Sequence, residues 1–215
     1  MEAGRTTETK RAAPRLYLVT APVADAVALD GPLGDALKAA DIAAVLVRLA
    51  GGDERTQINR IKKLAATVQE AGAALVIGGN AALVARAGAD GAHLSGIEAF
   101  QAALGTLKPQ RIAGCGGLTT RHDAMSAAEV GADYVMFGEP NQDGQQPSFE
   151  AVLDRVAWWA EVFEVPCVAC AANLDEVEAL ARAGADFVAI GEELWRDAAV
   201  LAEAGRRLTV AEPVG

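Results

Sequence analysis

Three glutamates in this chain come shortly after short apolar runs, where parallel strands place groups that can meet a ligand. They are Glu98, Glu139 and Glu192. Carboxylates that rim one mouth can ligate a divalent cation or hold a raised pKa for proton transfer. Glutamate also suits the first turn of a helix because of the helix dipole alone, so a structural role stays open for each.

One arginine and one histidine also lie near the ends of short apolar runs. Arg48 lies near the end of the apolar run 43–49. A buried guanidinium needs a partner, which a glutamate or a ligand anion would supply. His93 lies one residue before the end of the run 91–94 and is either an acid–base group of a ligand pocket or an inward-facing histidine with satisfied hydrogen bonds.

The chain has three cysteines, an odd number that indicates reduced thiols in a cytoplasmic protein. Cys167 and Cys170 form a C-x-x-C, but in a strand these positions point to opposite faces, which favours packing over a metal or redox pair. Cys115 and Cys170 both end strands, so a reactive thiol at either stays open.

The triplet Gly-Ala-Asp occurs at 88–90, 131–133 and 184–186, each time after an Ala-rich run and before an apolar one. In the third copy, residues 173–183 have helical spacing with Asn173 as N-cap, and Gly184 suits a left-handed helix end. The triplet is therefore predicted to end a helix, turn and start a strand. Its aspartate is expected to cap or turn the chain rather than to carry chemistry.

The same pattern predicts eight strands that alternate with helices. A short apolar run is typical of a parallel strand buried on both faces. The predicted strands are 15–20, 43–49, 73–79, 91–94, 111–115, 134–138, 165–170 and 187–191, and the helices are 31–40, 53–71, 80–87, 97–105, 120–130, 147–162, 173–183 and 192–206.

Eight such units within this length predict a single-domain (β/α)8 TIM barrel of the α/β class. An open doubly wound sheet is the alternative, but residues 21–34 lack its G-x-G-x-x-G turn. The barrel is expected over residues 14–210, between a disordered tail at 1–13 and a short tail at 211–215. Its active site should then lie at the carboxyl ends of the strands.

The composition and net charge indicate which classes of binding partner to expect. The 215 residues are 52% hydrophobic and carry a formal net charge of −10, which argues against nucleic acid. No apolar run reaches the length of a membrane span, and the first residues lack a secretory signal. We expect a cytoplasmic protein with a small-molecule ligand, and a homodimer is a candidate assembly, since Trp158 or Trp159 should pack on the barrel or on a second copy.

Several stretches resemble the thiamine-phosphate synthase/TenI superfamily of barrels. LYLVTAP is similar to the family's opening LYLVTD, and LVIGGNAALVARAGADGAHLSG to its LIVNDRxDLAxxxGADGVHLGQ. GADYVMFGEP resembles GADYIGxGPVF, and VPCVACAAN…AGADFVAIGEELW resembles IPVVAIGG…AGADGVAVVSAI. The resemblance covers roughly residues 15–200 and implies a thiamine-biosynthetic transferase with the barrel fold.

The resemblance also implies site residues, several of which depart from the family. The family's Gln-Leu-Arg-x-Lys strand end, which grips the pyrimidine pyrophosphate, retains only Arg48. Its Asn-Asp pair for pyrophosphate and Mg²⁺ falls on Gly78 and Gly79, and its second Mg²⁺ carboxylate on Glu98. The serine after strand 5 falls on Gly117, and Glu139 opens a loop without the family's lysine.

At the thiazole-phosphate site, the family's Gly-Gly becomes Ala171 and Ala172, and its Val-Ser becomes Gly191 and Glu192. A carboxylate there repels phosphate. The TenI branch offers an aromatising tautomerase whose histidine aligns with Thr119, with His122 nearby.

Two functions are therefore expected. The first is a divergent thiamine-synthase-like or TenI-like protein that binds or acts on a thiazole or pyrimidine precursor, with Arg48 as anion anchor, His93 and Glu98 near the chemistry, and Mg²⁺ as its metal. The second is a repurposed, non-catalytic barrel that binds a small cation or metal at an acidic mouth.

Overall fold

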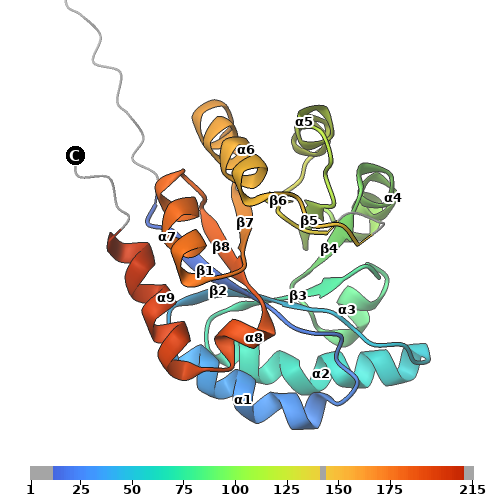
Figure 1. Ribbon diagram of the computed structural model, residues 1–215. Coiled ribbons are helices and arrows are strands. Elements are labelled where there is room, and N and C mark those ends of the chain that lie inside the picture. The colour runs from blue at the N-terminus through green and yellow to red at the C-terminus, as the bar shows by residue number, and fades with distance from the viewer. Residues whose placement is uncertain (1–11, 141–143, 211–215) are drawn as a thin grey trace, which may run out of the picture.

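A computed structural model describes residues 12–140 and 144–210. Eight parallel strands form a closed barrel in which each strand pairs with its neighbours in the chain and β8 pairs with β1. Helices surround the strands (Figure 1). The strands are β1 Arg15–Val19, β2 Ile42–Val47, β3 Ala74–Gly78, β4 Gly91–Ser95, β5 Ile112–Gly116, β6 Tyr134–Phe137, β7 Cys167–Ala171 and β8 Phe187–Ile190. The predicted TIM barrel is confirmed.

The helices follow the predicted order, with shifted ends. They are α1 Ala26–Ala39, α2 Glu54–Glu70, α3 Leu83–Ala87, α4 Ile97–Leu107, α5 Arg121–Glu129, α6 Phe149–Val162, α7 Leu174–Arg182, α8 Glu192–Trp195 and α9 Ala198–Val210. Helix α1 starts five residues before the predicted 31, because Asp25 caps it and Ala26 and Leu29 belong to its buried face. The helix predicted at 192–206 is two helices, since Asp197 caps the start of α9.

The strands are apolar throughout because both faces are buried. In β1, Leu16 and Leu18 belong to the core between strands and helices, whereas Tyr17 and Val19 belong to a smaller cluster inside the barrel. Alternation of this kind follows from the two-residue period of a strand. The barrel interior is thus filled with side chains and is not a pore.

The Gly-Ala-Asp triplets have the predicted role at the amino-terminal end of the barrel. Gly88 ends α3 in the left-handed conformation, with φ of 75°, and the equivalent glycines also have positive φ. The aspartate side chain then accepts a hydrogen bond from a backbone N–H of the preceding strand. The pairs are Asp90 with Leu75 (2.7 Å), Asp133 with Ala113 (2.7 Å) and Asp186 with Cys167 (2.8 Å).

A fourth aspartate stands at the same point before β2. Asp41 accepts two hydrogen bonds from the guanidinium of Arg15 at the start of β1, at 2.9 and 2.6 Å. The aspartates before β2, β4, β6 and β8 therefore all bind the strand that precedes them in the chain.

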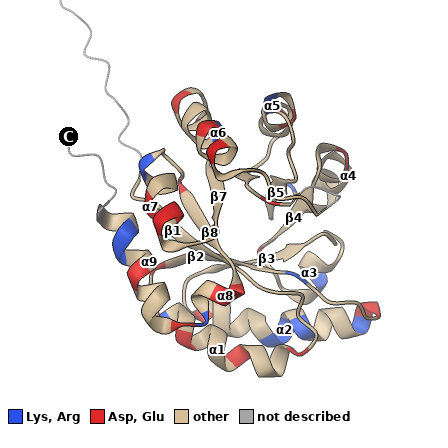
Figure 2. Ribbon diagram, viewed as in Figure 1, with Lys and Arg blue, Asp and Glu red and all other residues tan. Residues whose placement is uncertain are grey.

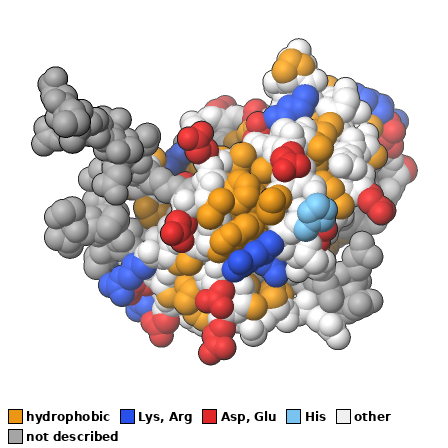
Figure 3. Space-filling view, turned by 90° about the horizontal axis from the view of Figure 1, so that it is seen from above, with side chains coloured by type: hydrophobic (Ala, Val, Ile, Leu, Met, Phe, Trp, Pro, Cys, Tyr) orange, Lys and Arg blue, Asp and Glu red, His pale blue; other side chains and the backbone are white. Residues whose placement is uncertain are grey.

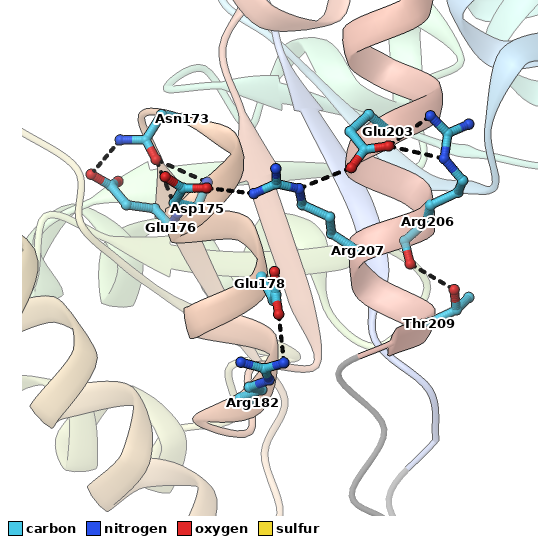
Figure 4. Close-up of polar contacts among 9 residues, drawn as sticks. All are labelled: Asn173, Asp175, Glu176, Glu178, Arg182, Glu203, Arg206, Arg207 and Thr209. Carbon is cyan, nitrogen blue, oxygen red and sulfur yellow. Dashed lines mark hydrogen bonds and ion pairs between the residues drawn. The ribbon is translucent and has the colours of Figure 1, made fainter.

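Charged residues lie mostly on the outer helices and loops, and the strands carry few of them (Figure 2). On the face shown in Figure 3, apolar side chains gather near the middle and charges of both signs surround them. Figure 4 shows how α9 is joined to α7: Arg207 binds Asp175 at 2.6 Å and Glu203 at 3.1 Å. Among helices in the described ranges, none combines the length and apolarity of a membrane span.

The predicted tails are only partly covered. Residues 1–11 and 211–215 lie outside the described residues, and Ala12 and Ala13 precede β1 without regular secondary structure. The barrel begins at Arg15 and its last helix ends at Val210, close to the predicted 14–210.

Candidate functional site

A pocket of about 400 Å³ opens at the carboxyl ends of the strands. It is lined by residues after β1, β2, β6, β7 and β8, among them Thr20, Arg48, Glu139, Ala171, Ala172 and Glu192. A second cavity of about 210 Å³ adjoins it and contains Gly117, Thr119 and Arg155. Gly138 and Glu139 line both cavities, so Glu139 stands where the two meet.

Glu139 is held by groups from three other segments. Its Oε2 atom lies 2.9 Å from His93 Nε2 and accepts the Gly117 N–H at 3.1 Å. Its Oε1 atom lies 3.6 Å from Arg48 Nη2. Only 9% of the Glu139 side chain is exposed, against 42% for Arg48. The pocket floor thus presents a carboxylate and a guanidinium side by side.

The charge state of Glu139 follows from these partners. Burial alone would raise the pKa of this carboxyl group, but His93, Arg48 and the Gly117 N–H together lower its pKa below the ordinary value. Glu139 is therefore a carboxylate near neutral pH.

Behind His93, two tyrosines continue the hydrogen bonding into the barrel. His93 Nδ1 lies 3.0 Å from the Tyr134 hydroxyl, which lies 2.8 Å from the Tyr17 hydroxyl. All three side chains are buried. Burial raises the pKa of both tyrosines well above 10, so both hydroxyls keep their protons.

Carboxylates of the chain also occupy backbone N–H groups at the mouth. Glu192 Oε2 accepts the Ala21 N–H after β1, and Glu176 Oε2 accepts the Ala172 N–H after β7, both at 2.8 Å. Glu139 does the same for Gly117 after β5. Barrels of this kind often bind phosphate at the loops after strands 7 and 8, where the Ala172 N–H stands. Here these three N–H groups are already hydrogen-bonded to glutamate.

A family model described as thiamine monophosphate synthase matches residues 16–194. The chain belongs to this family.

Relatives within the thiamine monophosphate synthase family are close in length to this chain. A thiamine-phosphate synthase of Rhodospirillum centenum is 35% identical over 184 residues, covering 84% of this chain and 89% of that protein. One of Hyphomonas neptunium is 35% identical over 202 residues, covering 88% and 90%.

A solved structure shares the fold. Thiamine phosphate pyrophosphorylase from Pyrococcus furiosus superimposes with a TM-score of 0.73 at 20% identity, over 94% of this chain and 97% of that one.

The site residues that the family resemblance implies meet only in part. Arg48, Glu139, Ala171, Ala172 and Glu192 line the main pocket. His93 lies beneath it, bound to Glu139, and Gly117 lines the adjoining cavity. Glu192 is also paired with Arg196, at 2.7 Å.

The other predicted residues stand apart from both cavities. Gly78 and Gly79 line neither, although Gly78 lies against the Arg48 side chain. Glu98 is exposed in the first turn of α4 and lines neither cavity. Its predicted place near His93 in the chemistry is therefore not supported by the geometry.

The family's Mg²⁺ does not fit the residues present. By the resemblance, Gly78 and Gly79 stand where the family has its Asn-Asp pair for pyrophosphate and Mg²⁺, and the Glu98 side chain is exposed to solvent. Within residues 12–140 and 144–210 no group of three His, Cys, Asp or Glu could hold a metal ion.

The remaining sequence candidates are resolved by their packing. His122 is exposed and lines neither cavity, whereas Thr119 lines the smaller one and binds Asp123. Cys167 packs in the strand–helix core and Cys170 against the barrel interior, on opposite faces as predicted. Trp159 is fully buried and packs on Phe137 of β6. Of the two predicted roles, packing on the barrel or on a second copy, Trp159 has the first.

Sequence reasoning missed Tyr17, Tyr134 and Glu176. The tyrosines stand inside apolar runs and read as core residues. A signal was present in β5, where glycines alternate in Ile-Ala-Gly-Cys-Gly and leave space inside the barrel.

Proposed function

We propose that this chain binds a thiazole or pyrimidine precursor of thiamine in the pocket at the carboxyl ends of its strands. Family membership supports the substrate class, since the relatives are named thiamine-phosphate synthases. The observation that carries the assignment to this pocket is the Arg48–Glu139–His93 cluster at its floor. It offers a hydrogen-bond donor and an acceptor, which suits the polar edge of a heterocycle.

The pocket is poorly suited to the pyrophosphate of a standard synthase reaction. Of the charged residues that line it in the described part of the chain, four are glutamates (139, 176, 192 and 193) and one is Arg48. Two like charges at 4 Å repel by about 4 kcal/mol at an effective dielectric near 20. We therefore expect the unphosphorylated heterocycles to bind more tightly than their phosphate esters.

Calorimetric titration tests this proposal. The ligands are the thiazole alcohol and its phosphate, and the hydroxymethylpyrimidine and its pyrophosphate, each with and without Mg²⁺. We expect heat from the alcohols, weaker binding of the esters and no gain from Mg²⁺. Tighter binding of the pyrophosphate with Mg²⁺, and formation of thiamine phosphate from the two esters, would instead make the chain a standard synthase.

Two variants locate the site in the same titrations. Arg48→Gln removes the cation at the pocket floor and should weaken binding, whereas Arg182→Gln changes an exposed arginine at the end of α7 that does not line the pocket. Equal binding by both variants and the parent chain would place the ligand elsewhere.

The same glutamates favour a second function, a barrel that binds a small cation. Glu139 and Glu192 both line the pocket. Glu139→Gln and Glu192→Gln should then weaken binding of a cationic probe such as thiamine. Unchanged affinity in both variants excludes this second function.

A further inference from the structure

Four side chains form a continuous chain of hydrogen bonds from the barrel interior to the pocket. The hydroxyl of Tyr17 in β1 meets that of Tyr134 in β6, which meets Nδ1 of His93 in β4. His93 Nε2 then meets Glu139 at the pocket floor. The Tyr134 and His93 rings are stacked, with an interplanar angle of 12°. This chain of hydrogen bonds, named here the Tyr–His–Glu relay, links buried hydroxyls to a group that lines the pocket.

Counting protons gives the relay a direction. Within the described residues the Tyr17 hydroxyl has one hydrogen-bond partner, the Tyr134 oxygen, so Tyr17 donates to Tyr134. Tyr134 must then donate its own proton to His93 Nδ1, which accepts through its lone pair. The imidazole proton is left on Nε2 and is donated to Glu139. In the reverse direction the Tyr17 proton would be buried without an acceptor.

We propose that Tyr17 and Tyr134 are positioning residues that hold His93 as its Nε2–H tautomer, and that His93 in turn holds Glu139 in the pocket as an ionised hydrogen-bond acceptor. The relay itself is a property of the ligand-free chain. Its meaning for binding rests on the proposed function of the pocket.

The neighbouring strand β5 supports the relay independently. A Cβ atom at Gly114 would overlap the Tyr134 ring and hydroxyl, and one at Gly116 would overlap the Glu139 carboxylate and the His93 ring. Both positions of β5 that face the relay are thus glycine. Cys115 between them points into the strand–helix core. The relay side chains occupy the space that is left free because residues 114 and 116 are glycines.

The direction of the relay has a consequence for the ligand. Glu139 Oε2 is taken by His93 and the Gly117 N–H, which leaves Oε1 for the pocket, 3.6 Å from Arg48 Nη2. The floor therefore offers an acceptor at one point and a donor beside it. It selects a ligand that brings an N–H or O–H group to Glu139 and an acceptor to Arg48.

Nitrogen NMR of the ligand-free protein tests the relay directly. The chain has two histidines, and His122 is exposed, so His122→Gln leaves His93 as the single imidazole without touching the relay. With ¹⁵N-labelled histidine at pH 7, we expect the pattern of a neutral ring with a protonated Nε2 and a bare, hydrogen-bonded Nδ1. A protonated Nδ1, in a neutral or doubly protonated ring, overturns the proposal.

Two phenylalanine variants test the positioning role. In Tyr134→Phe the Nδ1 loses its donor, so its signal should move to that of a nitrogen without a hydrogen bond. Tyr17→Phe should move the signal in the same sense by less, because it removes only the donor that polarises Tyr134. An unchanged Nδ1 signal in the folded variants overturns the role of the tyrosines, and Tyr17→Phe alone decides if Tyr134→Phe does not fold.

Binding gives the second readout. If the alcohols bind, Tyr134→Phe should weaken their affinity about five- to tenfold, because His93 is no longer fixed in the tautomer that holds Glu139. If no alcohol binds, the proposed function fails, but the NMR pattern of the ligand-free chain still decides the relay.

Discussion

Glu139 and His93 are 46 residues apart in the chain, and their side chains meet at 2.9 Å beneath the pocket. The contact joins the loop after β6 to the middle of β4. Both side chains are at least nine-tenths buried. A change at either residue should therefore affect stability as well as binding.

Glu139→Gln should lower the free energy of unfolding by about 1–3 kcal/mol at pH 7, because a buried charge-assisted hydrogen bond becomes a neutral one. The folded-state pKa of Glu139 lies below 4.5, so its carboxylate stabilises the fold above that pH. This contribution is lost as pH falls through the folded pKa. Urea unfolding should show the gap between parent and variant narrowing below about pH 4.5.

The control for this series is Glu161→Gln, an exposed glutamate near the end of α6. It should change stability by less than about 0.5 kcal/mol at any of these pH values. A gap that widens toward low pH for Glu139→Gln would contradict the ionised state assigned to this residue.

Gly114→Ala and Gly116→Ala should each destabilise the chain by about 1–3 kcal/mol, because the added methyl group overlaps relay side chains. Gly105→Ala is the matched control: this glycine lies in α4 with open space around it, and alanine there should stabilise by about 0.5–1 kcal/mol. Thermal unfolding distinguishes the three. Equal destabilisation by Gly105→Ala would show that the losses at Gly114 and Gly116 do not come from overlap with the relay side chains.

Asp90→Ala should lower stability by about 1–3 kcal/mol, because it leaves the Leu75 N–H without its acceptor at the start of β3. Asp90→Asn keeps an oxygen acceptor and should cost less. Denaturant unfolding of the two variants gives the comparison. Equal losses would assign the effect to charge rather than to the backbone hydrogen bond.

The thiols should resist modification in the native state. Burial raises the pKa of Cys115 to about 12 and that of Cys170 further, so neither is a thiolate at pH 8. A disulfide reagent at pH 8 should label the folded chain far more slowly than the chain in denaturant. Rapid labelling of Cys170, which lines the pocket, would revive the reactive-thiol hypothesis.

The fold could be predicted because each strand is buried on both faces and therefore reads as an apolar run between helical patterns. Arg48, Glu139 and Glu192 were predictable as pocket residues because each stands within two residues of a strand end. Glu98 was not, since α4 begins at Ile97 and its first turn leaves the carboxylate in solvent.

The relay could not be read from the sequence in the same way. Tyr17 and Tyr134 are 117 residues apart, and each looks apolar among Leu, Val and Met. Their hydroxyls can form hydrogen bonds with each other and with His93 only because the closed barrel brings β1, β4 and β6 around a common interior. Linear spacing carries no such information, because register between distant strands is fixed by the closed sheet.

The four aspartates at the amino-terminal end of the barrel join its eight strands in four pairs. Asp41, Asp90, Asp133 and Asp186 each fasten an even-numbered strand to the odd-numbered strand before it, and Asp41 alone does so through a side chain, that of Arg15. The barrel is thus a ring of four two-strand modules, and the same aspartate contact recurs in each of them. The loops at the carboxyl ends of the strands differ from one another and do not show this repeat. Chimeras with relatives should tolerate exchange at the boundaries between modules better than cuts within one, because only the latter sever an aspartate from its strand.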